Sequence, residues 1–238
     1  MSAEASAAIN KVDATAAKGG SERDVREGAM EGVLIACGEH GFRETSVRSI
    51  LAHSGGHRAQ FYQHFESKED CFAQAYGVWI ERLCVSLLEA AATTPGWEAG
   101  VREAIVRLFQ FVTGRPAIAR ALFVEVHIAG EPAMARHEAA VERLAAAIDS
   151  ARTDVDPDEA PPEATGAFVV GGIESCVAEA LAGDRPESVW DALPELMHFA
   201  AGSYFGNAEA EGAFERASEM LERERARLVG TVEEDKAQ

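Results

Sequence analysis

Basic and hydrogen-bonding side chains gather between residues 42 and 68 of a chain that is otherwise strongly acidic. The chain has 238 residues and a formal net charge of −18, from 22 basic and 40 acidic residues. Within 42–68 the charged residues are Arg43, Arg48, Arg58 and Lys68 against Glu44 and Glu66. Arginine, lysine and glutamine side chains bind phosphate oxygens and the edges of bases. The local charge therefore suits an anionic partner, although the total charge argues against one.

Helical segments are needed to position these side chains. A helical pattern of apolar residues runs from about 22 to 40. Gly41 is suited to end it, because glycine readily adopts the left-handed conformation found after a helix C-terminus. Thr45 is predicted to cap a second, short helix. Ser54-Gly55-Gly56 then forms a turn.

A third short helix is predicted after the turn, over about 57–64. Ser67 is a good cap for a much longer helix over about 68–92, and Glu69 and Asp70 in its first turn suit the helix dipole. A helix, a capped short helix, a glycine-containing turn and another short helix together make the helix-turn-helix pattern. The second short helix of that pattern enters the major groove of DNA.

Three stretches of this segment carry a resemblance to a known family. They are GFRETSVRSI at 41–50, the Ser54-Gly55 turn and FYQHFESKE at 61–69. Together they resemble the N-terminal domain of the TetR (tetracycline-repressor-like) family of bacterial transcriptional regulators, over about 28–75. The resemblance implies an all-α fold, with a three-helix DNA-binding domain followed by a helical domain for ligand binding and dimerisation. It also implies a sequence-specific regulator: a repressor released from a palindromic operator by a small molecule, or an activator.

The predicted DNA contacts form two groups. The early residues of the third helix are expected to contact base edges, since Arg58 can pair with guanine and Gln60 with adenine. Phosphate contacts are expected at Thr45 through the helix N-terminus and at Lys68 through its positive charge. The resemblance adds Tyr62 and His64. The full predicted set is Thr45, Arg48, His57, Arg58, Ala59, Gln60, Tyr62, His64 and Lys68.

One pair of residues departs from the family pattern. After the turn glycine the family usually has an apolar residue and then Ser or Thr, whereas this chain has Gly56 and His57. Glycine removes an apolar anchor, and histidine is a poor N-cap. The pose of the third helix, and with it the base contacts, is therefore left open. A charged His57 can also contact a phosphate or a base, which would strengthen binding at low pH.

The rest of the chain also has helical periodicity. Helices are predicted near 97–113, 116–128, 132–151, 164–182 and 187–205, with an acidic, proline-rich loop at 152–163 and one charged surface helix near the end. The resulting division is a disordered tail over 1–21, a DNA-binding domain over 22–74, a ligand-binding and dimerisation domain over 75–207, and a charged C-terminal helix and tail over 208–238.

Apolar and ionisable side chains on these helices give candidate ligand and dimer contacts. A carboxylate or imidazole amid apolar residues is costly to bury without a partner, so such groups either line a pocket or lie on an exposed face. The candidate ligand set is Trp79, Phe109, Phe123, Glu125, His127, Phe168 and Glu174, and it favours an apolar effector. Family members form homodimers through their last two large helices, which gives Phe168, Gly172, Cys176, Leu193, Met197, Ala200 and Tyr204.

Other function classes find little support. No glycine-rich phosphate loop, GxSxG, HExxH or metal-spaced Cys/His cluster occurs, so no enzyme, cofactor or metal site is expected. The N-terminus shows no signal-peptide pattern, and no apolar run approaches the ~18 residues needed for a membrane span, so a cytoplasmic chain is expected. The alternative is a helical ligand- or protein-binding module without DNA binding, which the charge of −18 and Gly56-His57 would suit.

Overall fold

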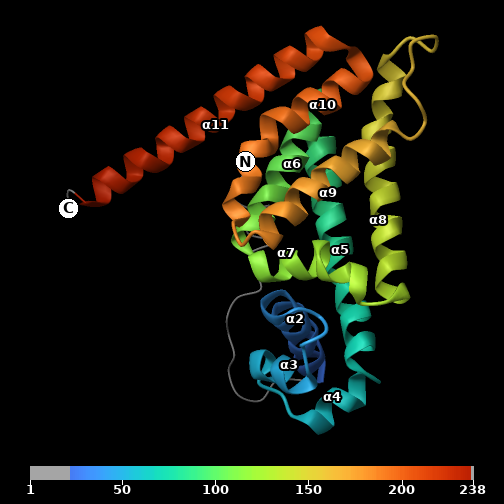
Figure 1. The fold of residues 1–238 in the computed structure, drawn as a ribbon, viewed down its shortest axis with the longest axis vertical. Helices are drawn as coiled ribbons and strands as arrows, with labels where there is room; N and C mark the ends of the chain where they lie inside the picture. The colour runs from blue at the N-terminus through green and yellow to red at the C-terminus, as the bar shows by residue number, and fades with distance from the viewer. Residues whose placement is uncertain (1–21, 237–238) are drawn as a thin grey trace.

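The computed structural model describes residues 22–236, with side chains described over 24–223. The predicted tail over 1–21 lies outside this range. Every regular element within it is a helix, which confirms the all-α prediction (Figure 1). The elements are α2 (Glu22–His40), α3 (Val47–Ser54), α4 (Arg58–His64), α5 (Lys68–Thr93), α6 (Trp97–Gly114), α7 (Pro116–Phe123), η1 (Glu125–Ile128), α8 (Glu131–Asp149), η2 (Ser150–Asp154), α9 (Thr165–Ala182), η3 (Pro186–Ala192), α10 (Leu193–Phe205) and α11 (Asn207–Lys236).

Helices α2, α3 and α4 form a small N-terminal bundle at one end of the molecule (Figure 1). Ile50 of α3 and Phe61 of α4 are buried in its core, and Phe65 after α4 closes the same core. Gly41 ends α2 with a φ of +84°, and its N–H donates to the carbonyl of Cys37 at 2.8 Å. The three helices therefore lie where the sequence predicts them.

The cap of α3 differs from the prediction. Ser46, not Thr45, is the N-cap, and its hydroxyl accepts from the backbone N–H of Ser49. The Thr45 side chain points inward instead: only 4% of the residue is exposed, and its hydroxyl donates to the carbonyl of Gly41 at 2.8 Å. Its oxygen also lies 3.1 Å from the carbonyl oxygen of Ala36. Thr45 thus holds the loop against the end of α2 from inside the N-terminal bundle. Its methyl group favours this buried position.

The long helix α5 links the N-terminal bundle to a larger C-terminal bundle, made of α5 to α10 (Figure 1). Within the latter, α5 packs against α6 and α8, and α9 packs against α7 and α8. Ser67 caps α5 as predicted, since its hydroxyl accepts from the N–H of Asp70. Helix α11 packs against α10 and then extends away from the bundle.

Two predicted helices are each broken in the structure. The helix predicted over 116–128 becomes α7 and η1, because the chain turns at Val124 and brings the Glu125 carboxylate to the backbone of Phe42. The helix predicted over 187–205 becomes η3 and α10, with Pro194 in the first turn of α10. Proline has no N–H to donate and disfavours helical backbone before it, so it suits the start of a helix and not its middle.

Helix α9 contradicts the expectation that no apolar segment is long enough to span a membrane. It is 18 residues long with a mean hydropathy of 1.3, which by length and composition alone would let it cross a membrane. Core helices of other proteins meet the same test, and α9 packs against α7, α8 and α10. Only 44% of its residues are buried, so part of a strongly apolar helix faces outward.

The two bundles meet where α2 packs against α7. A Cβ atom added to Gly38 would lie 1.9 Å from the carbonyl oxygen of Ala117, so no side chain separates the two backbones. An ion pair flanks this contact, with Arg115 Nη1 3.3 Å from Glu31 Oε1. We refer to the Gly38–Ala117 contact as the joint.

Candidate DNA-binding face and effector cavity

Helix α4 presents a polar face outward and an apolar face to the core. Phe61 is buried, whereas Arg58 and Ala59 are exposed and 47% of Tyr62 is exposed. The Arg58 guanidinium lies 5.5 Å from the centre of the Tyr62 ring and donates to its hydroxyl at 3.4 Å. These two side chains, one turn apart, form a single exposed patch with hydrogen-bond donors for a phosphate or a base edge.

The first turn of α4 explains how the chain tolerates His57 as an N-cap. The side-chain oxygen of Gln60 accepts from the backbone N–H of His57 at 3.1 Å, which supplies one half of a capping box. Reading adenine with both amide atoms would require that oxygen to leave the cap. Gln60 is therefore held for helix capping, and Arg58 is the residue of α4 best placed to contact a base.

Two predicted phosphate contacts are engaged inside the protein. The Thr45 hydroxyl is buried as described, and the Lys68 ammonium donates to the carbonyl of Phe42 at 2.6 Å while lying 4.3 Å from the centre of its ring. The side chain of Lys68 is only 16% exposed. Ser46 and Arg48 are exposed near the start of α3, as are Arg43 and Glu44 in the preceding loop. Sequence reasoning missed Ser46, although a serine three residues before Ser49 is a recognisable capping signal.

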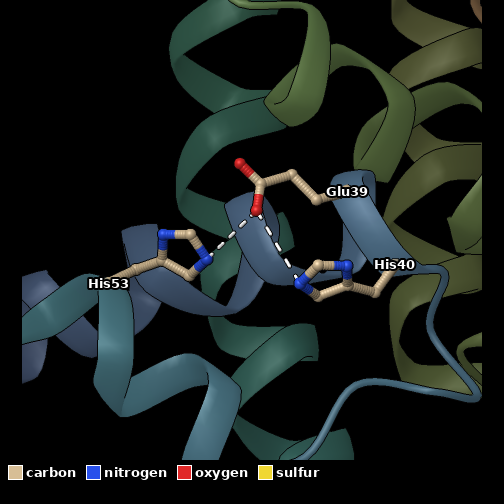
Figure 2. Close-up of side chains that lie close together, drawn as sticks. All are labelled: Glu39, His40 and His53. Carbon is tan, nitrogen blue, oxygen red and sulfur yellow. Dashed lines mark ion pairs between the residues drawn. The ribbon is translucent and has the colours of Figure 1, made fainter.

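The ends of α2 and α3 bring together a small group of possible metal ligands, Glu39, His40 and His53 (Figure 2). Oε2 of Glu39 lies 3.3 Å from Nε2 of His53 and 3.8 Å from Nε2 of His40. Two imidazoles and one carboxylate are a donor set that Zn²⁺ accepts. All three residues are exposed at the surface, and none of them lies on α4 or beside the cavity described next.

A narrow apolar cavity of about 90 Å³ lies inside the C-terminal bundle, between α5, α6, α8 and α9. Its walls are almost wholly aliphatic, and its polar groups are Glu174 of α9 and His137 of α8. Nδ1 of His137 is hydrogen-bonded to the Tyr76 hydroxyl at 3.0 Å, and its Nε2 lies 3.7 Å from Oε1 of Glu174. The cavity is therefore an apolar space with one polar corner.

Burial shifts the protonation of this corner. Desolvation raises the pKa of the Glu174 carboxyl to about 7. Desolvation, and secondarily the nearby His127, lowers the pKa of His137. Near neutral pH the corner can thus hold a neutral carboxylic acid beside a neutral imidazole. Such a pair can both donate hydrogen bonds to a ligand and accept them.

The comparisons with known proteins bear on the N-terminal bundle and on the fold separately. Residues 36–75, which span the end of α2, the whole of α3 and α4 and the start of α5, match the family model described as bacterial regulatory proteins, tetR family. The chain thus contains a tetR-family segment over residues 36–75. It is accordingly a DNA-binding transcriptional regulator, and a binding module without DNA contacts is not favoured.

Solved structures share the fold of this chain over most of its length. The fatty acid degradation regulator FadR from Bacillus halodurans is 12% identical with a TM-score of 0.63, over 73% of this chain and 96% of that one. FadR from Bacillus subtilis, in complex with stearoyl-CoA, is 12% identical with a TM-score of 0.63, over 75% and 97%. A TetR family transcription regulator from Marinobacter aquaeolei VT8 is 22% identical with a TM-score of 0.56, over 82% and 94%.

The predicted ligand residues do not all meet at one place. Phe123 and Glu174 line the cavity. Trp79 packs on Phe111, and Phe109 on Trp190. The remaining three lie elsewhere: Glu125 accepts from the Phe42 N–H, the His127 ring contacts His137, and 70% of Phe168 is exposed. Tyr76 and His137 were missed, and the sequence offers no clear signal for His137, which stands between Arg136 and Glu138.

The predicted dimer contacts also separate into two groups. Leu193, Met197, Ala200 and Tyr204 are buried within their own chain, so the expectation that they meet a partner is wrong. The Tyr204 hydroxyl donates to Asp149 at 2.5 Å. Helical periodicity alone did not show which face of α10 packs inward. Phe168, Gly172 and Cys176 of α9 lie at least partly exposed, and Phe199 of α10 and Phe214 of α11 are exposed large apolar residues as well.

Proposed function

We propose that the chain is a homodimeric repressor that binds a palindromic operator and is released by a small molecule in the apolar cavity. The observation that carries this proposal is the pairing of an exposed Arg58–Tyr62 patch with an apolar cavity, with helix α5 running from the first bundle into the wall of the second. Repression requires access to chromosomal DNA, so the protein acts in the cytoplasm. The expected division into functional units follows the two bundles, close to residues 22–74 and 75–207.

On DNA, α4 occupies the major groove with Arg58 toward a guanine. Ser46, Arg48, Tyr62 and His64 contact phosphates on either side of it. Each base-contacting arginine contributes about 1–3 kcal/mol of discrimination between bases. The strong negative charge of the remaining surface repels DNA and so favours approach through the N-terminal bundle.

The dimer forms through the exposed apolar face of α9 and the adjoining part of α10 and α11. A strongly apolar helix that is less than half buried in its own chain leaves an apolar surface for a partner. Phe168, Phe199 and Phe214 supply the large side chains of this face. Two copies related by a two-fold axis present two α4 helices, which suits half-sites separated by about one or two turns of DNA, at ~34–36 Å per turn.

The dimer leaves the operator if the effector stabilises a placement of the two N-terminal bundles other than the one that fits the DNA. The cavity wall includes Phe123 at the end of α7, and α7 presses on α2 at the joint. A ligand that binds one arrangement of these helices more tightly shifts the population toward it. The structural relative from Bacillus subtilis was solved with stearoyl-CoA, which supports an effector with a long apolar portion.

Selection of bound duplexes from a randomised DNA pool tests this proposal. Enrichment of an inverted repeat is expected, and a flat pool with a folded, dimeric protein would refute it. Arg58→Ala should lose most discrimination at one base pair in each half-site, with affinity for that site reduced about tenfold or more. Arg223→Ala is the matched control, because Arg223 is an exposed arginine on α11 far along the chain from α4.

A further inference from the structure

Four arginines line an open groove that adjoins the apolar cavity. The groove has a volume of about 760 Å³ and runs between α5 and α8, with the side of α2 at one end. Its charged residues are Arg26, Arg82, Arg136, Arg143 and Glu81. In a chain of net charge −18, four arginines against one glutamate give this groove a local positive charge. A groove of this kind attracts an anion.

The arginines are positioned by their neighbours. A Cβ atom on Gly77 of α5 would lie 2.8 Å from Cδ and Nε of Arg136, so the absence of a side chain at Gly77 makes room for that arginine. Arg143 pairs with Glu81, and Arg26 donates to the side chain of Gln74 at 2.6 Å. Planar guanidinium groups fixed in this way bind phosphate through two parallel hydrogen bonds.

The groove and the cavity share two lining residues, Ile80 of α5 and Ala140 of α8. From Ile80 the cavity continues along α5 to Ala91, about 16 Å at the rise of an α-helix. Because the volume is only about 90 Å³, a long aliphatic chain can enter this space only if the surrounding helices move apart. The two spaces thus match the two halves of one amphiphile.

We propose that the groove and the cavity form one bipartite site for a phosphorylated amphiphile, whose head group binds the four arginines and whose aliphatic chain enters and widens the cavity. This inference rests on the proposed function of the cavity as the effector site. The shared chemistry of the head is two or more phosphate charges, as in a coenzyme A thioester or a phosphorylated lipid. The polar corner at Glu174 and His137 lies within the cavity, within reach of a carbonyl on the chain.

Such a ligand would contact both bundles directly. Arg26 belongs to α2, whereas Arg82, Arg136 and Arg143 belong to α5 and α8. A head group that binds Arg26 together with the other three replaces the Gln74 contact of Arg26 and so changes how α2 is held. The anion thereby favours one placement of the N-terminal bundle, independently of the joint at α7.

The test compares ligands that share a chain but differ in the head. Binding of stearoyl-CoA, stearate, free coenzyme A and stearoyl lysophosphatidate to the full-length protein is measured by titration calorimetry. We expect stearoyl-CoA to bind at least tenfold more tightly than stearate or free coenzyme A. In R82A/R136A its affinity should fall at least tenfold, with stearate unaffected. R185A/R223A is the control of equal charge change, and thermal unfolding verifies that both variants are folded.

Each outcome decides the question. If lysophosphatidate binds as tightly as stearoyl-CoA, the site takes phosphorylated amphiphiles of the lipid kind; if stearoyl-CoA alone binds, it takes thioesters. Equal affinity for stearate and stearoyl-CoA, no binding of any probe, or an unchanged R82A/R136A variant would overturn the proposal. Operator binding is measured separately on the same protein. An operator complex that no amphiphile dissociates refutes the effector site, whereas ligand binding without any operator refutes the repressor.

Discussion

At the scale of single residues, Glu125 shows how a buried charge can serve structure. The residue is 5% exposed, its carboxylate accepts from the backbone N–H of Phe42 at 2.7 Å, and Arg120 lies 3.7 Å away. The sequence correctly marked Glu125 as a carboxylate amid apolar residues. Its partner could not be predicted, because the N–H of Phe42 lies 83 positions earlier in the chain. Glu125 therefore ties α7 and η1 to the loop after α2.

Removal of that tie should destabilise the protein. Glu125→Ala leaves the Phe42 N–H without an acceptor in a buried place, which costs about 1–3 kcal/mol in the free energy of unfolding. Urea denaturation measures it, with Glu138→Ala, an exposed glutamate on α8, as the control. A loss below about 0.5 kcal/mol would contradict the assigned role.

Glu174 gives a pH-dependent prediction. Its pKa is raised from 4.5 to about 7 by burial, so the folded chain holds the proton more tightly than the unfolded chain. The resulting stability is present below pH 4.5 and is lost as pH rises through 7. His137, whose pKa is lowered, acts in the opposite sense below its ordinary value of 6.5.

Glu174→Gln removes the titration of this carboxyl. The variant should exceed the parent in free energy of unfolding, and this advantage should be about 2–3 kcal/mol larger near pH 8 than near pH 5. Denaturation at the two pH values measures the difference, with the exposed Glu179→Gln on the same helix as the control. An equal difference at both pH values would show that Glu174 does not titrate in this range.

At the scale of elements, the sequence predicted helices well and their caps and breaks less well. Apolar periodicity fixed α2, α5, α6 and α9 closely, because each presents one continuous face to the core. The N-cap of α3 moved from Thr45 to Ser46, since two adjacent hydroxyl residues can each cap a helix and packing decides between them. The breaks at Val124 and before Pro194 depend on contacts and on local backbone preferences, which periodicity does not record.

The cap of α3 can be tested by a matched pair of substitutions. Ser46→Ala removes the acceptor for the Ser49 N–H and should lower the free energy of unfolding by about 1 kcal/mol. Ser175→Ala, at an exposed serine of α9, should change it by less than about 0.5 kcal/mol. Urea denaturation of both variants provides the comparison. If Ser46→Ala matches Ser175→Ala, the cap contributes nothing to stability.

At the scale of the whole molecule, two surfaces stand out against an acidic background. One is the arginine groove, and the other is the exposed apolar face of α9 to α11. The sequence contained a sign of the first, since Arg136 and Arg143 are seven residues apart and so lie on one side of α8. The groove itself could not be predicted, because α2 and α5 contribute Arg26 and Arg82 only after the bundles have packed.

The apolar face gives a prediction about assembly. Phe168 is 70% exposed, so Phe168→Glu should leave the folded chain intact while placing a charge in the proposed dimer contact. Light scattering should show a dimer for the parent and a monomer for the variant at micromolar concentration. Val85→Glu, at an exposed apolar residue of α5, should remain dimeric. A dimeric Phe168→Glu variant would place the interface elsewhere.

The joint between α2 and α7 has a consequence for how such a protein diverges. Gly38 and Ala117 meet backbone to backbone, so the route from the cavity to the N-terminal bundle does not depend on the identity of any side chain there. The cavity, in contrast, is walled by aliphatic side chains that can be exchanged one for another at small cost. Under the proposed function, related proteins that keep a glycine at this position can therefore change the ligand of the cavity and still transmit its binding to the N-terminal bundle.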